Sequence, residues 1–295
     1  MASPFLKWAG GKSRLVPAVA EAVAGLSAGR YFEPFLGGGA MFFGLRERGA
    51  IATATLNDLN PELIEAYTLV RDQSPEVIRG LRQLEEEYLA ATHEGRATIY
   101  YRVRSSAPEA PLARAVRLIF LNKTCFNGLY RVNRSGQFNV PHGRYSRPRI
   151  CPETAIQASA EALGQSRLLC ADFTDVCGAA AAGDLVYLDP PYQPISATSS
   201  FTAYTELSFG MADQARLAHT VREMTQRGVH VVLSNSAHPM LEELYRGYHI
   251  RRVKMARAIN SVGGGREPID ELLITSFEWG GPEVASEDPG LTNVA

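Results

Sequence analysis

Asp184-Leu185-Val186-Tyr187-Leu188-Asp189-Pro190-Pro191-Tyr192 is the stretch that decides the fold: a short apolar run that ends in a carboxylate, two prolines and an aromatic ring. The run predicts a buried strand, which must end at Pro190 because proline has no N–H to donate to a neighbouring strand. Asp189 is therefore expected at the carboxyl edge of a sheet, where open α/β folds bind their ligands.

A strand end of this composition suits a reaction of an aromatic amine. The exocyclic amino group of a purine is a poor nucleophile because its lone pair is delocalised into the ring, so acceptors must hold its two hydrogens. The Asp189 carboxylate and the Pro190 carbonyl can be those acceptors, and Tyr192 offers a face on which a flat base can stack. An ordinary strand followed by a Pro-Pro turn remains the alternative at this point.

Length and composition bound the architecture. With 295 residues, of which 45% are hydrophobic, the chain can bury a full core. We expect an α/β sheet domain built from residues 1–72 and 166–279, interrupted by an insertion at 73–165 and followed by a disordered tail at 280–295. No apolar run approaches ~20 residues, so no membrane span is expected. The N-terminal residues lack a signal-peptide core, which indicates a cytoplasmic protein.

The formal net charge is −1, but the basic residues are unevenly distributed. No acidic residue lies between Glu109 and Glu153. The basic residues of this interval are Arg114, Arg117, Lys123, Arg131, Arg134, Arg144, Arg147 and Arg149. A block of one sign favours nucleic-acid binding over a merely solvated face. Residues 126–141 also predict a hairpin that turns at Ser135-Gly136, and its arginines, asparagines and aromatic residues suit contacts with base edges and phosphates.

Two glycine turns precede the insertion. Gly10-Gly11 lies between Trp8 and Lys12, a combination that suits a ligand with a carboxylate and an aromatic ring, although an ordinary turn with a core Trp is nearly as good an interpretation. Residues 30–48 predict a strand, a turn over three glycines and a helix. Neither turn has the spacing of a Walker loop or of G-x-G-x-x-G.

The next predicted strand, residues 52–56, is followed by Asn57-Asp58. An acid at the end of the second strand of such a unit is placed to accept hydrogen bonds from ribose hydroxyls. The series of strand, glycine turn, helix, strand and acid therefore favours a nucleoside-containing cofactor over a purely structural βαβ unit.

Asp-Pro-Pro-Tyr downstream of a glycine turn resembles the signature of enzymes that methylate amino groups in DNA. From Phe5 to about Phe277 the sequence resembles the Dam-type DNA adenine methylase family of the alpha group, in which the recognition insertion lies between these two motifs. The resemblance implies a class I methyltransferase fold with a seven-stranded, mostly parallel sheet and helices on both faces. It also implies S-adenosylmethionine as cofactor, no metal, and N6 of a flipped adenine in double-stranded DNA, within GATC, as the target.

The resemblance also implies three sets of site residues. The catalytic set is Asp189, Pro190, Pro191 and Tyr192. The cofactor-binding set is Trp8, Lys12, Glu33, Phe35, Gly37, Gly39, Asp58, Asp172 and Asp189, with Asp58 on the ribose and Trp8 and Lys12 near the adenine and methionine ends. The DNA-binding set is Asn127, Leu129, Arg131, Asn133, Pro141, Arg144, Tyr145 and Ser196. Arg131 would recognise the first guanine and Ser196 a phosphate near the target base, while His142 and Ser146 depart from the Phe and Lys usual in the family.

Three alternatives remain at the level of the sequence. One is methylation of cytosine N4, although that subgroup usually carries Ser where this chain has Asp189. Another is a methyltransferase acting on protein glutamine or on RNA, and neither explains the hairpin with Arg131 well. The third is a DNA-binding protein with an idle methyltransferase centre. We expect a monomer, and the sequence leaves open whether a cognate restriction enzyme exists.

Overall fold

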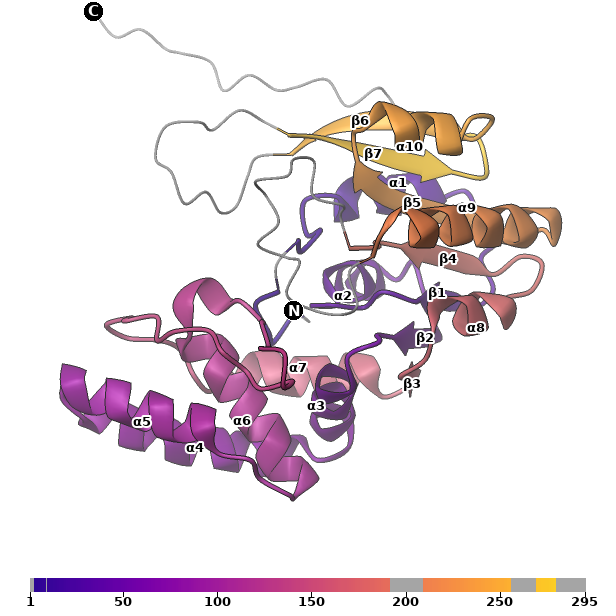
Figure 1. The fold of residues 1–295 in the computed structure, drawn as a ribbon. Coiled ribbons are helices and arrows are strands. Elements are labelled where there is room, and N and C mark those ends of the chain that lie inside the picture. Colours follow the sequence, from indigo (N-terminus) through magenta and orange to yellow (C-terminus); the bar gives the residue numbers. More distant parts are fainter. Residues whose placement is uncertain (1–2, 9, 192–208, 256–268, 280–295) are drawn as a thin grey trace, which may run out of the picture.

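The structure is a computed structural model, and it describes residues 3–8, 10–191, 209–255 and 269–279. Within these ranges seven strands form one sheet in the order β3-β2-β1-β4-β5-β7-β6 (Figure 1). The strands are β1 Tyr31–Glu33, β2 Ala54–Asn57, β3 Ser166–Leu169, β4 Leu185–Leu188, β5 His230–Ser236, β6 His249–Met255 and β7 Ile269–Thr275. Strands β1 to β5 are parallel, and β7 runs antiparallel to both β5 and β6.

The predicted strand before Asp189 is central to this sheet. All four residues of β4 are buried, and the strand pairs with β1 on one side and β5 on the other. The strand order reverses between β1 and β4, since the chain runs outward from β1 to β2 and β3 and then returns to β4. A topological switch point therefore lies where β1 and β4 end, and this is the position at which open α/β sheets form a ligand crevice.

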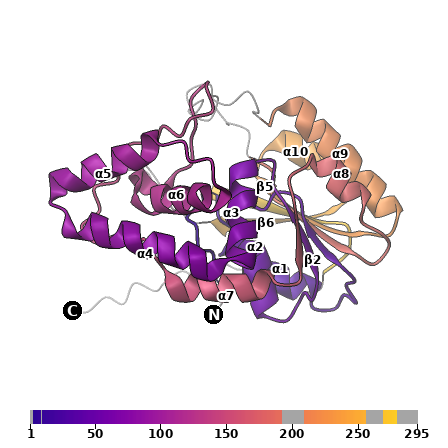
Figure 2. The same cartoon turned by 90° about the horizontal axis from the view of Figure 1, so that it is seen from below.

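Helices cover both faces of the sheet because alternate strand residues point to opposite sides (Figure 2). Tyr31 and Tyr187 belong to the apolar cluster on one face, whereas Phe32 and Val186 belong to the cluster on the other. The first cluster includes residues of α1 Val16–Val23, α2 Ala40–Glu47, α3 Pro61–Asp72 and α7 Glu153–Leu163. The second includes residues of α8 Phe173–Gly178, α9 Met211–Gln226 and α10 Pro239–Leu244. The predicted fold class is thereby confirmed.

The insertion is helical and extends the first of these cores. Between residues 73 and 165 lie α4 Ser74–Ala90, α5 His93–Ser105, α6 Pro111–Thr124 and α7, and both α6 and α7 pack against α3. Tyr88 and Phe120 of the insertion are buried in the same cluster as the sheet residues Tyr31 and Tyr187. The 3₁₀ turn η1 Phe126–Gly128 follows, and then the predicted hairpin, in which Val132 pairs with Phe138 around the turn. Because the core is continuous, the insertion is held rigidly beside the sheet.

Local details of three elements depend on the fold. Helix α5 buries only Ile99, Tyr100 and Val103, so the apolar pattern of its sequence is a weak helix signal. Helix α4 begins at Ser74, and its N-cap is Gln73. Strand β5 continues through Ser236, so Asn235 is fully buried inside the strand.

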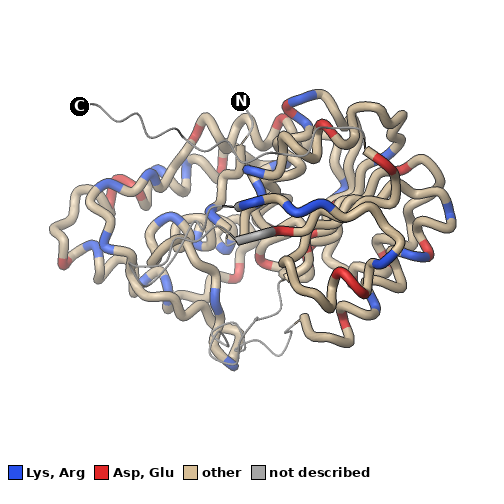
Figure 3. The backbone as a smooth tube through the Cα atoms, turned by 90° about the horizontal axis from the view of Figure 1, so that it is seen from above, with Lys and Arg blue, Asp and Glu red and all other residues tan. Residues whose placement is uncertain are grey.

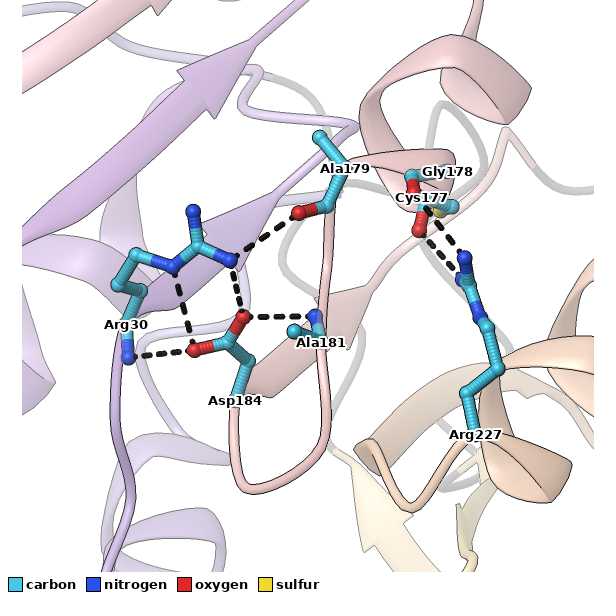
Figure 4. A network of polar contacts seen from close by, with 7 residues as sticks. All are labelled: Arg30, Cys177, Gly178, Ala179, Ala181, Asp184 and Arg227. Carbon is cyan, nitrogen blue, oxygen red and sulfur yellow. Dashed lines mark hydrogen bonds and ion pairs between the residues drawn. The ribbon is translucent and has the colours of Figure 1, made fainter.

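Arg30 and Asp184 fasten the opposite, amino end of the sheet (Figure 4). The Asp184 carboxylate accepts hydrogen bonds from the Arg30 backbone N–H at 2.8 Å, from the Arg30 guanidinium at 2.7 Å and from the Ala181 N–H at 2.8 Å. Burial raises the pKa of Asp184, but these hydrogen bonds outweigh it and the net shift is downward. In the same region Arg227 donates to the carbonyls of Cys177 and Gly178 at the end of α8.

Asp184→Ala should lower the free energy of unfolding by ~1–3 kcal/mol, because it removes the charged acceptor for the Arg30 guanidinium and for the backbone N–H groups of Arg30 and Ala181. Denaturant titration measures this, with Glu21→Ala on the exposed side of α1 as a control expected to stay within about 0.5 kcal/mol of wild type. Equal effects of the two substitutions would show that the Asp184 contacts contribute nothing particular.

Candidate active site

The side chain of Asn57 joins the carboxyl ends of three strands. Its amide nitrogen donates to the Pro34 carbonyl at 2.9 Å and to the Ala171 carbonyl at 3.0 Å, and its amide oxygen accepts from the Ala171 N–H at 2.9 Å. Asn57 is almost fully buried, so these bonds are sheltered from water. They hold the segments that carry Phe35, Asp58 and Asp172 at one edge of the sheet.

The glycine turn after β1 is fixed by Asp58 and by Trp8. The Asp58 carboxylate accepts from the Gly37 N–H and from the Asn60 N–H, both at 2.9 Å. Gly37 has φ +49°, and a Cβ at this position would lie 2.9 Å from Trp8 Cδ1, so only glycine allows the turn to rest against the indole. Burial raises the pKa of Asp58, while its backbone hydrogen bonds lower it in part. Trp8, Gly37 and Asp58 are thus brought together.

Asp189 follows β4 at the switch point and is held by side chains from two other segments. Lys12 Nζ lies 3.0 Å from Asp189 Oδ1, and the Ser234 hydroxyl of β5 donates to the same oxygen at 3.1 Å. Burial raises the pKa of Asp189 to about 6, and Lys12 opposes this shift. Asp189 retains 21% exposure of its side chain, Pro190 is buried and Pro191 is exposed. The carboxylate is therefore mainly ionised at pH 7 and still reachable from outside.

Glu33 is the last residue of β1, the strand next to β4. Its side chain is 2% exposed, and it accepts a hydrogen bond from the Tyr31 hydroxyl at 2.6 Å. Burial is the largest cause that raises the pKa of Glu33, to about 8, and the nearby Asp189 charge adds to it. Glu33 is therefore mainly protonated at pH 7. That Glu33 binds the cofactor stays a prediction. A cofactor bound at this position would contact a neutral carboxylic acid.

Phe35, Gly39 and Asp172 were also expected to bind the cofactor. Phe35 packs against Phe173 with ring centroids 5.3 Å apart and against Phe209 at 5.7 Å, which forms a small aromatic group at the edge. Gly39 has φ +69° and is the N-cap of α2. Asp172 caps α8 through the Thr174 N–H and pairs with Arg216 at 2.9 Å. The Asp172 carboxylate thus has a structural role in addition to any role toward a ligand.

The expected DNA-binding residues lie in the segment after α6. Arg131 donates to the Asn139 side-chain oxygen at 2.6 Å and to the Asn139 carbonyl at 3.2 Å, so here it braces its own hairpin. Asn133 accepts from the Ser135 and Gln137 N–H groups and thereby closes the turn. Asn127 and Arg144 are exposed and have left-handed backbones, with φ of 55° and 53°. Such strain is typical of functional loops.

Three more of the residues expected to bind DNA, namely Leu129, Pro141 and Tyr145, also lie in this segment. Leu129 is half-buried, Pro141 is exposed and its carbonyl accepts from the Phe126 N–H, and Tyr145 lies beneath the Lys7 ammonium at 4.8 Å. Tyr192 and Ser196 lie outside the described residues.

Apart from Arg131, the basic block separates into two groups of residues. Arg114 pairs with Glu65, and Arg117 donates to the carbonyls of Val103 and Arg104, so both are structural. In the described ranges, no carboxylate forms an ion pair with the second group, which consists of Lys123, Arg134, Arg144, Arg147 and Arg149. Burial, together with the nearby charges of Lys7 and Arg149, lowers the pKa of Lys123 to about 8. Figure 3 shows basic residues spread over the insertion, where an anion would relieve this repulsion.

His142 and Tyr130 acquire roles that the sequence did not indicate. His142 is buried and forms a hydrogen bond with the Tyr88 hydroxyl at 2.6 Å, and burial lowers its pKa. It is therefore a core residue of the insertion and not a DNA contact. Tyr130 stacks on Trp8 with ring centroids 5.3 Å apart and donates to Glu62 at 3.0 Å, which connects the insertion to the N-terminal loop and to α3.

Sequence reasoning also missed Asn57, Ser234 and Glu271 as parts of the edge. Glu271 lies on β7, and its carboxylate is 3.5 Å from Lys12 Nζ. A buried acid within the apolar run of β7 was a signal that could have drawn attention to Glu271. Asn57 stands directly before Asp58, but its bonds to β1 and β3 depend on strand order.

The arrangement is that of a class I S-adenosylmethionine-dependent methyltransferase: a switch point between β1 and β4, a glycine turn after β1, an acid after β2 and Asp-Pro-Pro after β4. The family model of the D12 class N6 adenine-specific DNA methyltransferases matches residues 8–259. The chain belongs to this family, and it is an adenine-specific DNA methyltransferase.

Characterised relatives agree with this assignment. The chain is 40% identical to the type II methyltransferase M.MjaIII of Methanocaldococcus jannaschii, over 93% of this chain and 99% of that protein. It is 36% identical to the type II methyltransferase M1.LlaDCHI of Lactococcus lactis subsp. cremoris, over 93% and 95% of the two chains. It is also 36% identical to the DNA adenine methylase of Escherichia coli K12, over 91% and 93%.

Membership of this family favours DNA adenine over cytosine N4, protein glutamine and RNA as the target. A crystal structure of a precorrin 8W decarboxylase aligns with a TM-score of 0.36 and 9% identity, over 93% of this chain and 95% of that one, which is too weak a likeness to carry an argument. None of the helices in the described part of the chain is both long and apolar enough to cross a membrane.

Glu33→Gln should be tolerated, because glutamine has the shape of the protonated acid. The folded state holds this proton up to a pH of about 8, whereas the ordinary pKa is 4.5, so the free energy of unfolding of the wild type should fall as the pH rises between these values. In Glu33→Gln this part of the decline should be missing, as measured by denaturation at several pH values. The same pH dependence in both proteins would contradict the burial of a neutral acid.

Proposed function

We propose that the protein transfers the methyl group of S-adenosylmethionine to N6 of an adenine flipped out of duplex DNA, within the sequence GATC. The observation that carries this proposal is the orientation of Asp189. Both Lys12 and Ser234 bind its Oδ1 atom, and among the described residues no donor binds Oδ2, which can accept from a substrate. Oδ2 and the Pro190 carbonyl are the two acceptors that an amino group needs.

The residues at the edge suit this cofactor. Asp58 uses its carboxylate oxygens for backbone N–H groups, and each oxygen has a second lone pair that can accept from a ribose hydroxyl. Phe35 and Trp8 are aromatic side chains next to the glycine turn, and Lys12 is buried beside Asp189. When bound, the cofactor supplies a methyl group already activated by a sulfonium charge.

The contribution of the protein is then alignment and hydrogen bonding. Asp189 holds one amino hydrogen of adenine through Oδ2 and the Pro190 carbonyl holds the other, which draws the nitrogen toward tetrahedral geometry and directs its lone pair. Tyr192 is proposed to stack on the base. Positioning of this kind accounts for most of the acceleration in a direct displacement, because the two reacting centres no longer have to find each other.

The insertion is proposed to bind the duplex. Arg134, Arg144, Arg147 and Arg149 supply affinity through phosphates, which carry no sequence information. Arg131 is proposed to recognise the first guanine of GATC, since its guanidinium can donate to O6 and N7 at once. To do so it must exchange its bonds to Asn139 for bonds to the base. A monomer in the cytoplasm is sufficient for this activity, and a partner restriction enzyme is not required by it.

Asp189→Ala should reduce methyl transfer more than ~100-fold and leave DNA binding nearly unchanged, because the side chain acts on N6 and not on phosphates. Transfer of tritium from labelled cofactor measures the first quantity, and fluorescence anisotropy of a labelled duplex measures the second. In the wild type the single-turnover rate should fall as the pH drops through about 6, where Asp189 becomes protonated. Normal turnover by Asp189→Ala would remove this residue from the mechanism.

Arg131→Ala should relax the preference for the first guanine, a contact worth ~1–3 kcal/mol of discrimination. Arg147→Ala is the matched control: it removes an exposed arginine of the same block, and it should weaken binding to every duplex alike and flatten the salt dependence. Initial rates on GATC and on duplexes changed at the first base decide the matter for each protein. If the ratio of these rates is unchanged in Arg131→Ala, then Arg131 only braces the hairpin through Asn139.

A further inference from the structure

Lys12 lies between two carboxylates that come from different strands. Its ammonium group is 3.0 Å from Asp189 Oδ1 after β4 and 3.5 Å from Glu271 Oε1 on β7, and it also donates to the Gly10 carbonyl at 2.9 Å. The Lys12 and Glu271 side chains are only 7% and 8% exposed. At such burial a charge interacts strongly with its neighbours, because little water screens it.

We propose that Glu271 is a positioning residue of the methyl-transfer reaction: it anchors the Lys12 ammonium beside Asp189 and holds a second carboxylate on the same ammonium group. The inference rests on the proposed role of Asp189 as the acceptor for N6. Glu271 itself touches neither of the proposed reacting atoms, and its effect passes through Lys12 and through space.

In the described part of the chain, the groups that face Asp189 come from several different segments. Lys12 approaches from the N-terminal loop, Ser234 from β5 and Glu271 from β7, while Glu33 lies below on β1 and Tyr187 of β4 shares a hydrogen bond with Ser234 at 2.9 Å. Lys12 and Ser234 stabilise the carboxylate form of Asp189. Burial and Glu271 destabilise it, and the resulting pKa of Asp189 is about 6.

These contributions have opposite signs, so two substitutions should move the titration of Asp189 in opposite directions. Glu271→Gln removes a negative charge and keeps an oxygen that can accept from Lys12, so Asp189 should titrate at lower pH. Ser234→Ala removes a hydrogen bond from the carboxylate, so Asp189 should titrate at higher pH. A general disturbance of packing would not lower the pKa of Asp189 in Glu271→Gln and raise it in Ser234→Ala.

The experiment is the pH dependence of single-turnover methylation of a GATC duplex at saturating cofactor. We expect the acidic limb to move down by at least about 0.5 pH unit in Glu271→Gln and up by a similar amount in Ser234→Ala. Glu271→Ala should lose rate at every pH, because Lys12 is no longer anchored, and Glu271→Gln should keep most of the rate because its amide oxygen can still accept from Lys12. Glu242→Gln, which breaks the surface pair with Arg252, is the control and should move neither quantity.

A second measurement separates this inference from the proposed function. Carboxyl ¹³C chemical shifts of aspartate-labelled protein, with Asp189 assigned by comparison with Asp189→Asn, follow the titration of Asp189 in the absence of substrate. If this titration is the same in wild type and Glu271→Gln, or moves upward in the variant, then the inference is wrong. If the titration moves down and the acidic limb of the rate does not, then Glu271 acts as inferred and the proposed role of Asp189 is wrong.

Discussion

The ion pair between Lys12 and Asp189 is the interaction on which the rest of this site depends. It joins the N-terminal loop to the end of the central strand, across the switch point of the sheet. A buried carboxylate without a partner would favour its neutral form. One oxygen of a neutral Asp189 would carry a proton and would be a poorer hydrogen-bond acceptor than a carboxylate oxygen. Lys12 offsets part of this penalty and, together with Ser234, fixes which oxygen remains available.

The N-terminal loop that supplies Lys12 also connects the two functions of the molecule. Trp8 rests against Gly37 of the glycine turn on one side and stacks on Tyr130 of the insertion on the other. The amide of Asn122 on α6 binds both the backbone N–H and the carbonyl of Lys7, at 2.8 and 2.7 Å. The glycine turn, which is proposed to bind the cofactor, and the insertion, which is proposed to bind DNA, therefore contact the same short loop. This shared contact fixes their positions relative to each other.

Much of this arrangement follows from the sequence, because it depends on neighbours along the chain. Pro190 must end β4 and so places Asp189 at an edge; Asn60 caps α3, and its side chain accepts from the Glu62 and Leu63 N–H groups as the Asn-Pro pair predicts. The contacts that could not be predicted join residues far apart in sequence. Glu271 meets Lys12 only because β7 turns back between β5 and β6.

Two further side-chain roles could not be predicted for the same reason, although the residues involved are closer together in the sequence. His142 finds Tyr88 across 54 positions, so it could not be recognised as a core residue from its own neighbourhood. Arg131 bonds to Asn139 across the hairpin, and the sequence alone allowed both this brace and base recognition. Residue types thus indicated the chemistry, whereas the strand order and the hairpin geometry decided which side chains act together.

The most direct test of the account uses DNA of random sequence, incubated with the protein and S-adenosylmethionine and then sequenced by a method that detects modified bases. One experiment reports the base, the atom and the sequence context. The account predicts N6-methyladenine at the adenine of GATC and little modification elsewhere. N6-methyladenine in another context would contradict the proposed role of the hairpin, and methyl groups on cytosine would contradict the chemistry proposed for Asp189 and Pro190.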